Sequence, residues 1–550
     1  MRAAVGVSVV GALALPAVTG SAPAHAAGWT TTATLAEPVA GLTDVGPLAA
    51  AEPLSVTVAL APRDRAAMAR DIAAGVVLTR RQFQSRFAPT STAVDRVVSY
   101  LHRQGFSGIS VAANHLQVTA TGTARQAETA FDTTLHALRL PARWGSRTVY
   151  ANLGPARVPA ALGGIVASVL GLSDVGTMHP DALAATNPAV SCVVPGVGYP
   201  CVYNPQGFWK AYDATNVTTG HGTTIAIMAE GDLTGVMKDL RTEEAANGLP
   251  EVAVRVIPTG PASTDTSGAD EWDLDTQYST GMAGNVGQLD IYDATSLSDA
   301  DIAREFNRFA SDDLARAGSA SFGECEYQAY LDGSMLADDM ALEQAALQGQ
   351  TMFASAGDTG GFCPVAPNNG VPAGVPDVNY PASSPYAVSV GGTTLVTGAD
   401  GAYSQEIAWL AGGGGISLFE SSPYWQAGDG TLYSQLSTVC MVQGCGRTVP
   451  DVANDADPNS GANVYISGAP TAVGGTSLAS PLTLGEWARM ETAAHNRLSF
   501  AGPLLYQKMG TAAFHDITLG DTGPYPATPG YDLATGIGTL DVARAVKTIG

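Results

Sequence analysis

The apolar and polar positions along the chain divide it into two parts with different patterns. Near the start, residues 54–60 alternate apolar and small polar side chains, which predicts a strand. Further elements follow in alternation: helices at 64–74, at 79–87 with Thr79 as cap, at 94–104 ended by Gly105, and at 124–131, with strands near 109–111 and 115–121. This pattern predicts a compact α+β body that ends near Leu172.

The second part has the pattern of a larger α/β body. Residues 223–229 are almost wholly apolar, as in a buried parallel strand. Helices are expected at 299–317 and 337–348, and short β-rich runs at 288–292, 351–355 and 387–390. Strands that alternate with helices predict a parallel sheet covered on both faces.

The segments around these bodies lack periodicity. We expect a signal peptide at 1–27, because Arg2 precedes the apolar run 5–15 and an A-x-A cleavage motif stands at 24–26. That apolar run is too short for a membrane anchor, so the protein is expected to be secreted and extracellular. Residues 28–50 are interpreted as a linker, and the first body is placed at 51–172. Residues 173–205 are interpreted as an interdomain segment, and the large body is placed at 191–550.

The charge of the chain is unevenly distributed. The net charge is −23, which argues against nucleic acid and anionic membranes as partners. Residues 1–181 hold 14 Arg, no Lys and 10 acidic residues, whereas residues 182–550 have a net charge of −27. A basic first part and an acidic second part are expected to attract each other.

Six cysteines agree with an exported protein. They permit 15 pairings. Cys192 with Cys201 and Cys440 with Cys445 would close short loops, which leaves Cys325 with Cys363. The sequence has no CxxC motif and no histidine at metal-finger spacing, so a zinc site is not expected.

A serine in the string Gly-Thr-Ser-Leu-Ala-Ser-Pro, residues 475–481, is the strongest candidate for catalysis. Small residues before Ser477 and a proline after it suit a turn that enters a helix, with Pro481 expected in the first turn. At a helix N-terminus Ser477 would lie in a field that favours developing negative charge. A simple helix cap is the alternative interpretation of this serine.

A serine nucleophile needs a base, and the chain offers two kinds. His221, in a His-Gly-Thr-Thr run, and His495 and His515 are better explained as surface or packing residues. Glu271 and Asp275 stand one helical turn apart and would share a helix face, which is also the pattern of a solvated face. Asp358 follows an apolar run in a glycine-rich turn, where an Asx turn is the simpler explanation.

Together these three motifs resemble the sedolisin (serine-carboxyl peptidase) family. So do the stretches Asn-Tyr-Pro-Ala-Ser-Ser-Pro-Tyr at 379–386 and Arg-Thr-Val-Pro-Asp-Val-Ala at 447–453. The resemblance implies a subtilisin-like parallel sheet flanked by helices, preceded by a ferredoxin-like propeptide of the kumamolisin type. The first body would then be an inhibitor and chaperone of the second, and residues 173–190 a processing segment.

The resemblance also assigns roles. It implies Ser477 as nucleophile, Glu271 as base, Asp275 as the residue that orients it, and Asp358 as oxyanion stabiliser. Ser321, Phe322 and Gly323 resemble the edge strand that binds extended peptide. Asp358 can donate only while protonated, and a carboxylate base works in acid, so activity is expected at low pH.

Three other functions remain in view at this point. The expected function is an endopeptidase that cleaves peptides or unfolded proteins, and the enzyme is expected to be a monomer. A tripeptidyl-peptidase of the same family is the main alternative. A catalytically silent homologue is disfavoured because all four catalytic positions are filled. A histidine-dependent subtilisin is disfavoured by the surroundings of its histidines.

The C-terminal region resembles the calcium loops of the family. The implied ligands of one structural Ca²⁺ are Asp516 and Asp532 with the carbonyl groups of Ile517, Thr528 and Gly530. Carboxylates and carbonyls at tight turns are the oxygen ligands this cation prefers.

Overall fold

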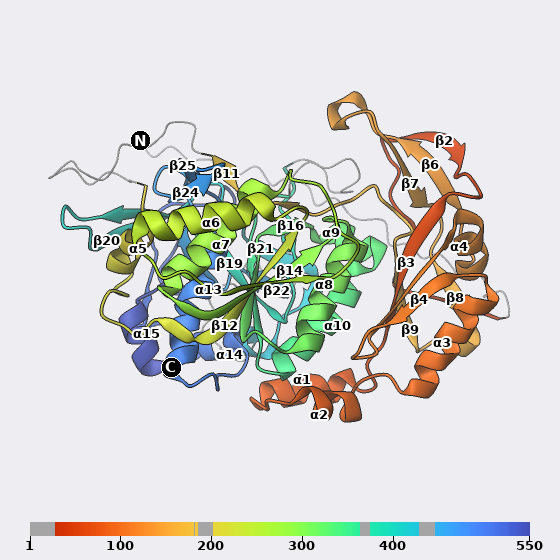
Figure 1. Cartoon of the computed structure of the whole chain (residues 1–550), viewed down its shortest axis with the longest axis horizontal. Coiled ribbons are helices and arrows are strands. Elements are labelled where there is room, and N and C mark those ends of the chain that lie inside the picture. The colour runs from red at the N-terminus through yellow and green to blue at the C-terminus, as the bar shows by residue number, and fades with distance from the viewer. Residues whose placement is uncertain (1–27, 181, 185–201, 364–373, 428–445) are drawn as a thin grey trace, which may run out of the picture.

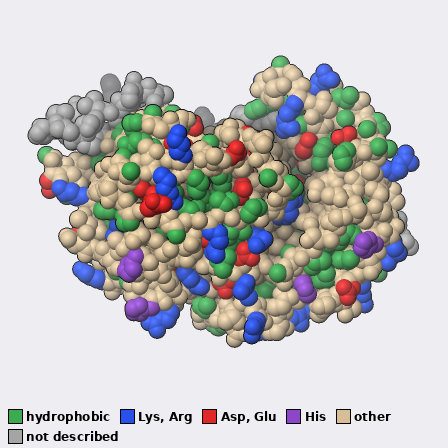
Figure 2. Space-filling model, viewed as in Figure 1, with side chains coloured by type: hydrophobic (Ala, Val, Ile, Leu, Met, Phe, Trp, Pro, Cys, Tyr) green, Lys and Arg blue, Asp and Glu red, His purple; other side chains and the backbone are tan. Residues whose placement is uncertain are grey.

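The computed structural model describes residues 28–180, 182–184, 202–363, 374–427 and 446–550 (Figure 1). The expected signal peptide, residues 1–27, and the two predicted cysteine loops, 192–201 and 440–445, lie outside the described residues. Figure 2 shows two bodies on either side of a notch in the upper surface. No helix among the described residues is long and apolar enough to cross a membrane.

The N-terminal body has the ferredoxin-like arrangement that the sequence predicts. Its antiparallel sheet has the order β4-β5-β3-β9, built from β3 (Pro53–Leu60), β4 (Ser107–Val111), β5 (Gln117–Thr123) and β9 (Val166–Leu170). Helices α3 (Ser91–Arg103) and α4 (Ala124–Phe131) make the two crossovers, giving the β-α-β-β-α-β topology. Buried apolar side chains from both helices and from the sheet form one core.

Local capping explains where several helices of this body begin. Helix α1 (Arg65–Ala73) starts after Asp64, which accepts a hydrogen bond from a helical N–H. Thr79 forms a capping box with Gln82 at the start of α2 (Arg80–Arg86). Thr123 does the same with Gln126 at the start of α4. These short-range signals are readable from sequence, and the predicted bounds of α4 match the observed ones.

Residues 28–50 differ from the expected linker. Strand β1 (Trp29–Thr31) pairs with β8 (Arg157–Pro159). Strand β2 (Thr43–Pro47) pairs with β6 (Leu135–Arg139), which pairs on its other side with β7 (Thr148–Asn152). The sequence pattern does not predict these strands, because an edge strand gains its hydrogen bonds from the backbone of its neighbour and needs no periodic side-chain pattern of its own.

The large body is a parallel α/β sheet with the order β13-β14-β12-β15-β17-β19-β20, and β23 also pairs with β19. All pairs are parallel except β19 with β20. The strands are β12 (Gly220–Glu230), β13 (Val254–Pro258), β14 (Val286–Ala294), β15 (Ala317–Ala320), β17 (Thr351–Ser355), β19 (Ala387–Thr397), β20 (Tyr403–Ala408) and β23 (Val452–Asp455).

Helices cover both faces of this sheet. Helices α7 (Ala269–Ala283) and α13 (Thr476–Ala493) pack together and on the central strands, and α6 (Thr234–Asn247) packs on α7. Helices α8 (Asp299–Asp312) and α10 (Ser334–Leu347) pack on each other and lie toward the N-terminal body. The helix expected at 299–317 is therefore too long, because Asp313 adopts a left-handed conformation and the chain enters β15 at Ala317.

The other helices of the described residues lie around these layers. They are α5 (Pro205–Ala211), α9 (Glu326–Asp332), α11 (Tyr424–Ala427), α14 (Ala501–Tyr506) and α15 (Val542–Thr548).

The N-terminal body docks its sheet on α8 and α10. An apolar cluster joins Ala59 and Leu170 of that sheet to Ala303, Ala337 and Met340 of the two helices. Asn114 donates to Asn307 Oδ1 at 2.7 Å and to Gln344 Oε1 at 2.9 Å. Of the ion pairs among the described residues, one crosses between the bodies: Arg65 Nε lies 2.7 Å from Glu343 Oε2.

Candidate active site

Ser477 lies at the start of α13, in the interior of the protein. The helix begins at Thr476 after Gly475, whose φ of +109° is a conformation that favours glycine. Ser477 has no exposed surface, and its Oγ donates to Ser321 O at 3.3 Å. The predicted turn into a helix is confirmed by the structure.

Pro481 occupies a different place from the one expected. It stands inside α13, beyond the first turn, so it cannot donate the backbone hydrogen bond that Ser477 O would receive four residues earlier. Ser321 Oγ lies 3.4 Å from that carbonyl oxygen. The proline therefore leaves the carbonyl group of Ser477 without its helical partner and open to the contact with Ser321, which lies between β15 and β16.

Glu271 and Asp275 lie on the first turns of α7, the helix packed against α13. Both are buried. Asp275 Oδ1 accepts a hydrogen bond from Ser321 Oγ at 2.6 Å. Burial raises the pKa of Asp275 well above its ordinary value, although the Ser321 hydrogen bond lowers it in part. Ser321 thus contacts both Asp275 and Ser477.

Asp358 is held against the first residue of α13. Its Oδ1 accepts from Thr476 N at 2.7 Å and from Thr476 Oγ1 at 2.8 Å. The turn that presents it depends on Gly357, whose φ is +105° and where a Cβ would collide with Asn379 Nδ2. Asn379 in turn donates to Ala356 O at 3.0 Å.

Thr476 and Asn379 therefore support the site, although the sequence assigned them no role of their own. Both stand in motifs that were recognised, beside Ser477 and at the head of the 379–386 stretch. Their partners are distant in the sequence, so nothing local could have identified the contacts.

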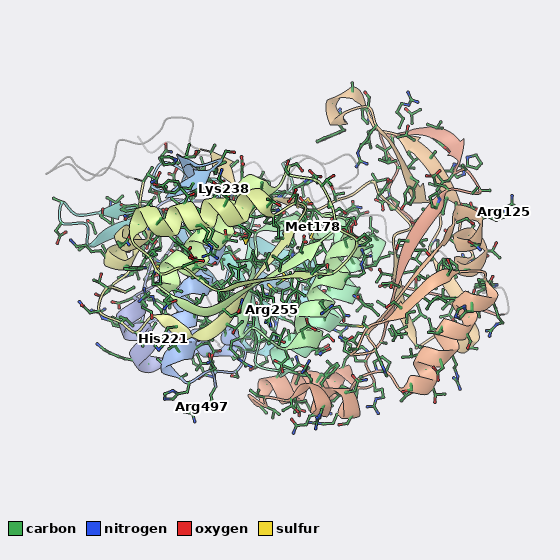
Figure 3. All side chains as sticks on the ribbon, in the orientation of Figure 1. Arg125, Met178, His221, Lys238, Arg255 and Arg497 are labelled. Atoms are coloured by element: carbon green, nitrogen blue, oxygen red, sulfur yellow. A yellow bond between two sulfur atoms is a disulfide. The ribbon has the colours of Figure 1, made fainter. Side chains whose placement is uncertain are left out.

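The three histidines lie elsewhere. His221 is exposed at the outer edge of the large body, where Figure 3 labels it. His495 is exposed just after the end of α13, with a φ of +55°. His515 stacks on Tyr403 with ring centroids 3.7 Å apart. Among the described residues, none of them hydrogen-bonds to Ser477.

The chain's own interdomain segment runs through this site. Strand β10 (His179–Pro180) pairs antiparallel with β16 (Phe322–Cys325), which joins β18 (Asn379–Tyr380) on its other side. Strand β11 (Leu183–Ala184) pairs antiparallel with β25 (Ala469–Gly474), just before Gly475. Between the two strands, Ala182 N donates to Glu271 Oε2 at 2.8 Å.

The residues expected to bind calcium are gathered in one loop region. Gly530 N lies 3.1 Å from both carboxylate oxygens of Asp516. Asp532 Oδ2 accepts from Thr528 N at 2.7 Å, and its Oδ1 accepts from Ala534 and Thr535. Burial raises the pKa of Asp532 to about 6. Both carboxylates accept hydrogen bonds from the backbone of residues 528–530, and paired carboxylates of this kind suit a cation that binds oxygen. Asp532 Oδ2 accepts a single hydrogen bond.

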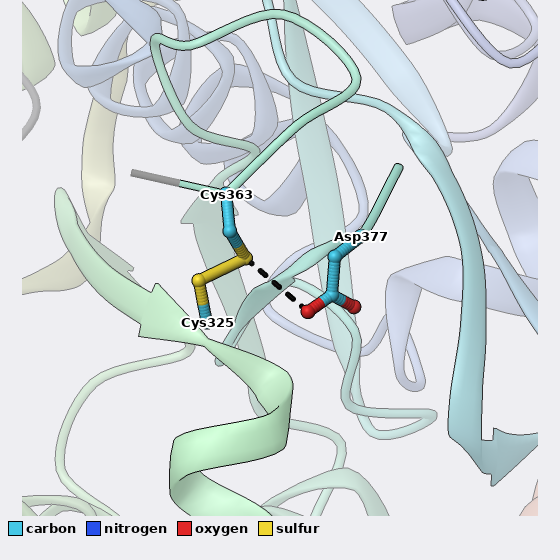
Figure 4. A group of neighbouring side chains, drawn as sticks. All are labelled: Cys325, Cys363 and Asp377. Carbon is cyan, nitrogen blue, oxygen red and sulfur yellow. Dashed lines mark hydrogen bonds between the residues drawn. A yellow bond between two sulfur atoms is a disulfide. The ribbon is translucent and has the colours of Figure 1, made fainter. Parts of the chain in front are cut away.

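A second cluster with metal-binding residue types does not suit a metal. Cys325, Cys363 and Asp377 lie together (Figure 4), but the two sulfurs form a disulfide. Disulfide sulfur carries no thiolate charge, so it is not a metal ligand of the usual kind. The pairing of Cys325 with Cys363 is the one that the sequence leaves when the other four cysteines are paired in short loops.

The fold and the buried serine at the head of a helix define a serine peptidase body that follows a ferredoxin-like propeptide. The model of the Pro-kumamolisin activation domain matches residues 40–175. Sedolisin of Pseudomonas sp. (strain 101) is 38% identical over 90% of this chain and 87% of its own length. This chain therefore belongs to the sedolisin family of serine-carboxyl peptidases.

Other comparisons agree. Xanthomonalisin of Xanthomonas sp. (strain T-22) is 34% identical over 90% of this chain and 65% of its own length. The solved structure of Pseudomonas sedolisin, complexed with two molecules of pseudo-iodotyrostatin, superposes with a TM-score of 0.59, at 36% identity over 64% of this chain and 98% of that one. Tripeptidyl-peptidase sed1 of Aspergillus fumigatus is 29% identical over 35% of this chain and 34% of its own.

Proposed function

We propose that this chain is the precursor of a secreted, acid-acting endopeptidase that forms its acyl-enzyme on Ser477. Ser477 Oγ attacks the carbonyl carbon of the scissile bond, and Glu271, oriented by Asp275, accepts the hydroxyl proton. Asp358 donates a hydrogen bond to the oxyanion. Glu271 returns the proton to the leaving amine, and water then hydrolyses the acyl-enzyme.

The observation that carries this proposal is the hydrogen bond from Ala182 N to Glu271 Oε2. An amide nitrogen that faces a carboxyl group is the atom that must receive a proton when its peptide bond breaks. Strand pairing on β16 before this point and on β25 after it holds the chain extended, as a substrate would be. We propose that the bond preceding Ala182 is the maturation site and that the propeptide acts as an intramolecular inhibitor.

The hydrogen bonds of Asp358 support its role in acid. Because Oδ1 already accepts two hydrogen bonds from Thr476, the proton of a neutral Asp358 carboxyl belongs on Oδ2. A carboxyl group protonated there acts as a hydrogen-bond donor, as Asp358 must to stabilise an oxyanion.

Endopeptidase action is favoured over tripeptidyl release by the path of the segment. The chain is continuous and held by hydrogen bonds from Met178 through Pro180. It therefore extends more than three residues before the proposed scissile bond. A tripeptidyl-peptidase needs a substrate groove that is closed within three residues of the scissile bond and that contacts the free amine of the substrate. Because tripeptidyl-peptidases are among the relatives of this chain, tripeptidyl release is the second candidate.

The remaining parts of the proposal concern the whole protein. We propose that residues 1–27 direct secretion to the extracellular space, that the mature enzyme is a monomer, and that one Ca²⁺ stabilises the C-terminal loops. Asp516, Asp532 and the carbonyl groups of Ile517, Thr528 and Gly530 would hold the ion. The ion would supply a structural clamp and take no part in the reaction.

One experiment tests the reaction and its type. The full precursor is incubated with a denatured protein from pH 3 to pH 8, and the products are identified by mass. An endopeptidase yields internal fragments, mainly in acid, and the Ser477→Ala precursor yields none. A ladder of tripeptides from the substrate N-terminus would establish the second candidate, and cleavage by the Ser477→Ala chain would refute both.

A further inference from the structure

Met178 is the residue at which the interdomain segment enters the core of the peptidase body. Val175 still belongs to an apolar cluster of the propeptide, with Leu138 and Val149. Met178, three residues later, is 1% exposed and belongs to the largest apolar cluster, which consists mainly of peptidase residues and also includes propeptide residues such as Met68 and Phe83. His179 and Pro180, which follow, are exposed. Figure 3 labels Met178 within the peptidase body, away from the propeptide sheet.

The backbone around Met178 is fixed from two sides. Met178 N donates to Leu297 O at 3.0 Å. His179 pairs with Gly323 and Pro180 with Phe322 on β16. The segment is therefore held between the loop that precedes α8 and the strand that begins at Phe322, so the position of the Met178 side chain is well defined.

The same core cluster includes residues of both flanking elements. Ile302 of α8 and Phe322 of β16 are buried members, and Leu297 packs against the cluster. The Phe322 ring lies against those of Trp272 and Phe306, with centroids 6.2 Å away in each case. Trp272 follows Glu271, so the apolar wall continues to the proposed base.

We propose that the space filled by Met178 is a substrate subsite that selects an apolar side chain four residues before the scissile bond. This inference rests on the proposed function, because that bond is counted from Ala182. When the propeptide leaves, Met178 leaves with it and the apolar space is open to substrate. Of the described residues from 178 to 184, Met178 is the most deeply buried, and it therefore anchors the segment.

The selection follows from burial. An apolar side chain that enters this space leaves water, whereas a small one leaves part of the space empty and a polar one loses its hydrogen bonds to water. A single missing methylene in an apolar pocket costs about 10- to 200-fold in discrimination. Exposed positions in the same segment have no such dependence.

The test compares quenched fluorescent peptides with the sequence of residues 174–186, cut by enzyme activated from the full precursor. Four peptides carry Met, Leu, Ala or Gln at the position of Met178, and two controls carry Ala at the positions of His179 or Leu183. We expect kcat/KM for Met and Leu within about threefold of each other, and at least about tenfold lower for Ala and Gln. The control substitutions should change kcat/KM by less than about threefold.

The outcomes separate the two proposals. Equal kcat/KM for Met, Ala and Gln, with cleavage at the same bond, overturns the subsite and leaves the proposed function standing. No Ser477-dependent cleavage of any peptide overturns both. In the full chain, Met178→Gln should slow self-processing while Met178→Leu and His179→Gln should not, and processing of Met178→Gln at the normal rate would also overturn the subsite.

Discussion

Ser321 Oγ lies 2.6 Å from Asp275 Oδ1, and both side chains are buried beside the candidate nucleophile. Because this hydrogen bond lowers the pKa of Asp275, the Ser321→Ala variant should raise that pKa further. We expect kcat to fall about tenfold, the effect of about one hydrogen bond, and the limb of the pH profile that depends on Asp275 to move to higher pH.

The matched control is Ser319→Ala. Ser319 is also buried, and its Oγ contacts Ser480 Oγ at 2.7 Å without a carboxyl group. Identical pH profiles in the two variants would contradict the proposed link between Ser321 and Asp275.

Three of the proposed catalytic residues, Ser477, Glu271 and Asp358, should each be required for maturation. Precursors with Ser477→Ala, Glu271→Ala or Asp358→Ala should fold and remain full length in acid, because the loss of a member of such a unit costs on the order of 10⁴-fold in rate. The wild-type chain should yield a mature form that begins at Ala182, as checked by intact mass and N-terminal sequencing. Normal processing of Glu271→Ala, with loss in His221→Ala, would refute the carboxyl base.

The mature enzyme should be less stable at pH 8 than at pH 5. Burial, with the charge of Asp377 beside it, raises the pKa of Glu326 to about 8. The folded state therefore binds a proton that the unfolded state releases near pH 4.5, and this stabilisation is present in acid and lost as pH rises toward 8. Each such group contributes a slope of ~1.4 kcal/mol per pH unit over that interval.

Denaturant unfolding of Glu326→Gln and of the exposed control Glu251→Gln checks this expectation. The Glu326→Gln enzyme should lose less stability between pH 5 and pH 8 than the wild type, whereas the control should follow the wild type. An equal loss of stability between pH 5 and pH 8 in both variants would mean that the pKa of Glu326 is not raised in the folded state.

Chelation should lower the melting temperature of the mature enzyme if Ca²⁺ is bound as proposed, because an ion bound to the folded state stabilises it by mass action. The effect should be larger at pH 7 than at pH 5, since protons compete for Asp532, whose pKa is raised to about 6. Asp532→Ala should be insensitive to chelator, and the nearby exposed Asp521→Ala should behave as wild type. A wild-type melting curve that chelator leaves unchanged would argue against the ion.

The attraction expected between a basic propeptide and an acidic enzyme includes one short ion pair among the described residues, Arg65 with Glu343. Burial raises the pKa of Glu343, and the neighbouring Arg65 guanidinium offsets that rise only in part. We therefore expect Arg65→Gln to weaken inhibition by the separate propeptide at pH 6.5, by about tenfold or more, and much less at pH 3.5, where Glu343 is neutral.

Arg125→Gln is the control, because Figure 3 places Arg125 on the far side of the propeptide. Inhibition by the wild-type propeptide that is equally tight at both pH values and indifferent to salt would rule out an electrostatic latch. Cleavage of the segment would then be the only trigger of activation.

The sequence by itself determined the elements whose signals are local. Capping at Thr79, the buried strand after His221 and the turn into a helix at Ser477 all depend on neighbouring residues, so a local pattern in the sequence predicts each of them. The sedolisin motifs could be recognised because each is a short, contiguous string.

The tertiary structure decided the contacts between distant positions. Thr476 reaches Asp358 across 118 residues, and Ala182 reaches Glu271 across 89. Residues 28–50 became strands because neighbouring edges offered backbone partners. Met178 is buried against the peptidase body because Leu297 binds its backbone and the two residues after it pair with β16. Such contacts depend on how the whole chain is packed, and no local pattern of side chains records that packing.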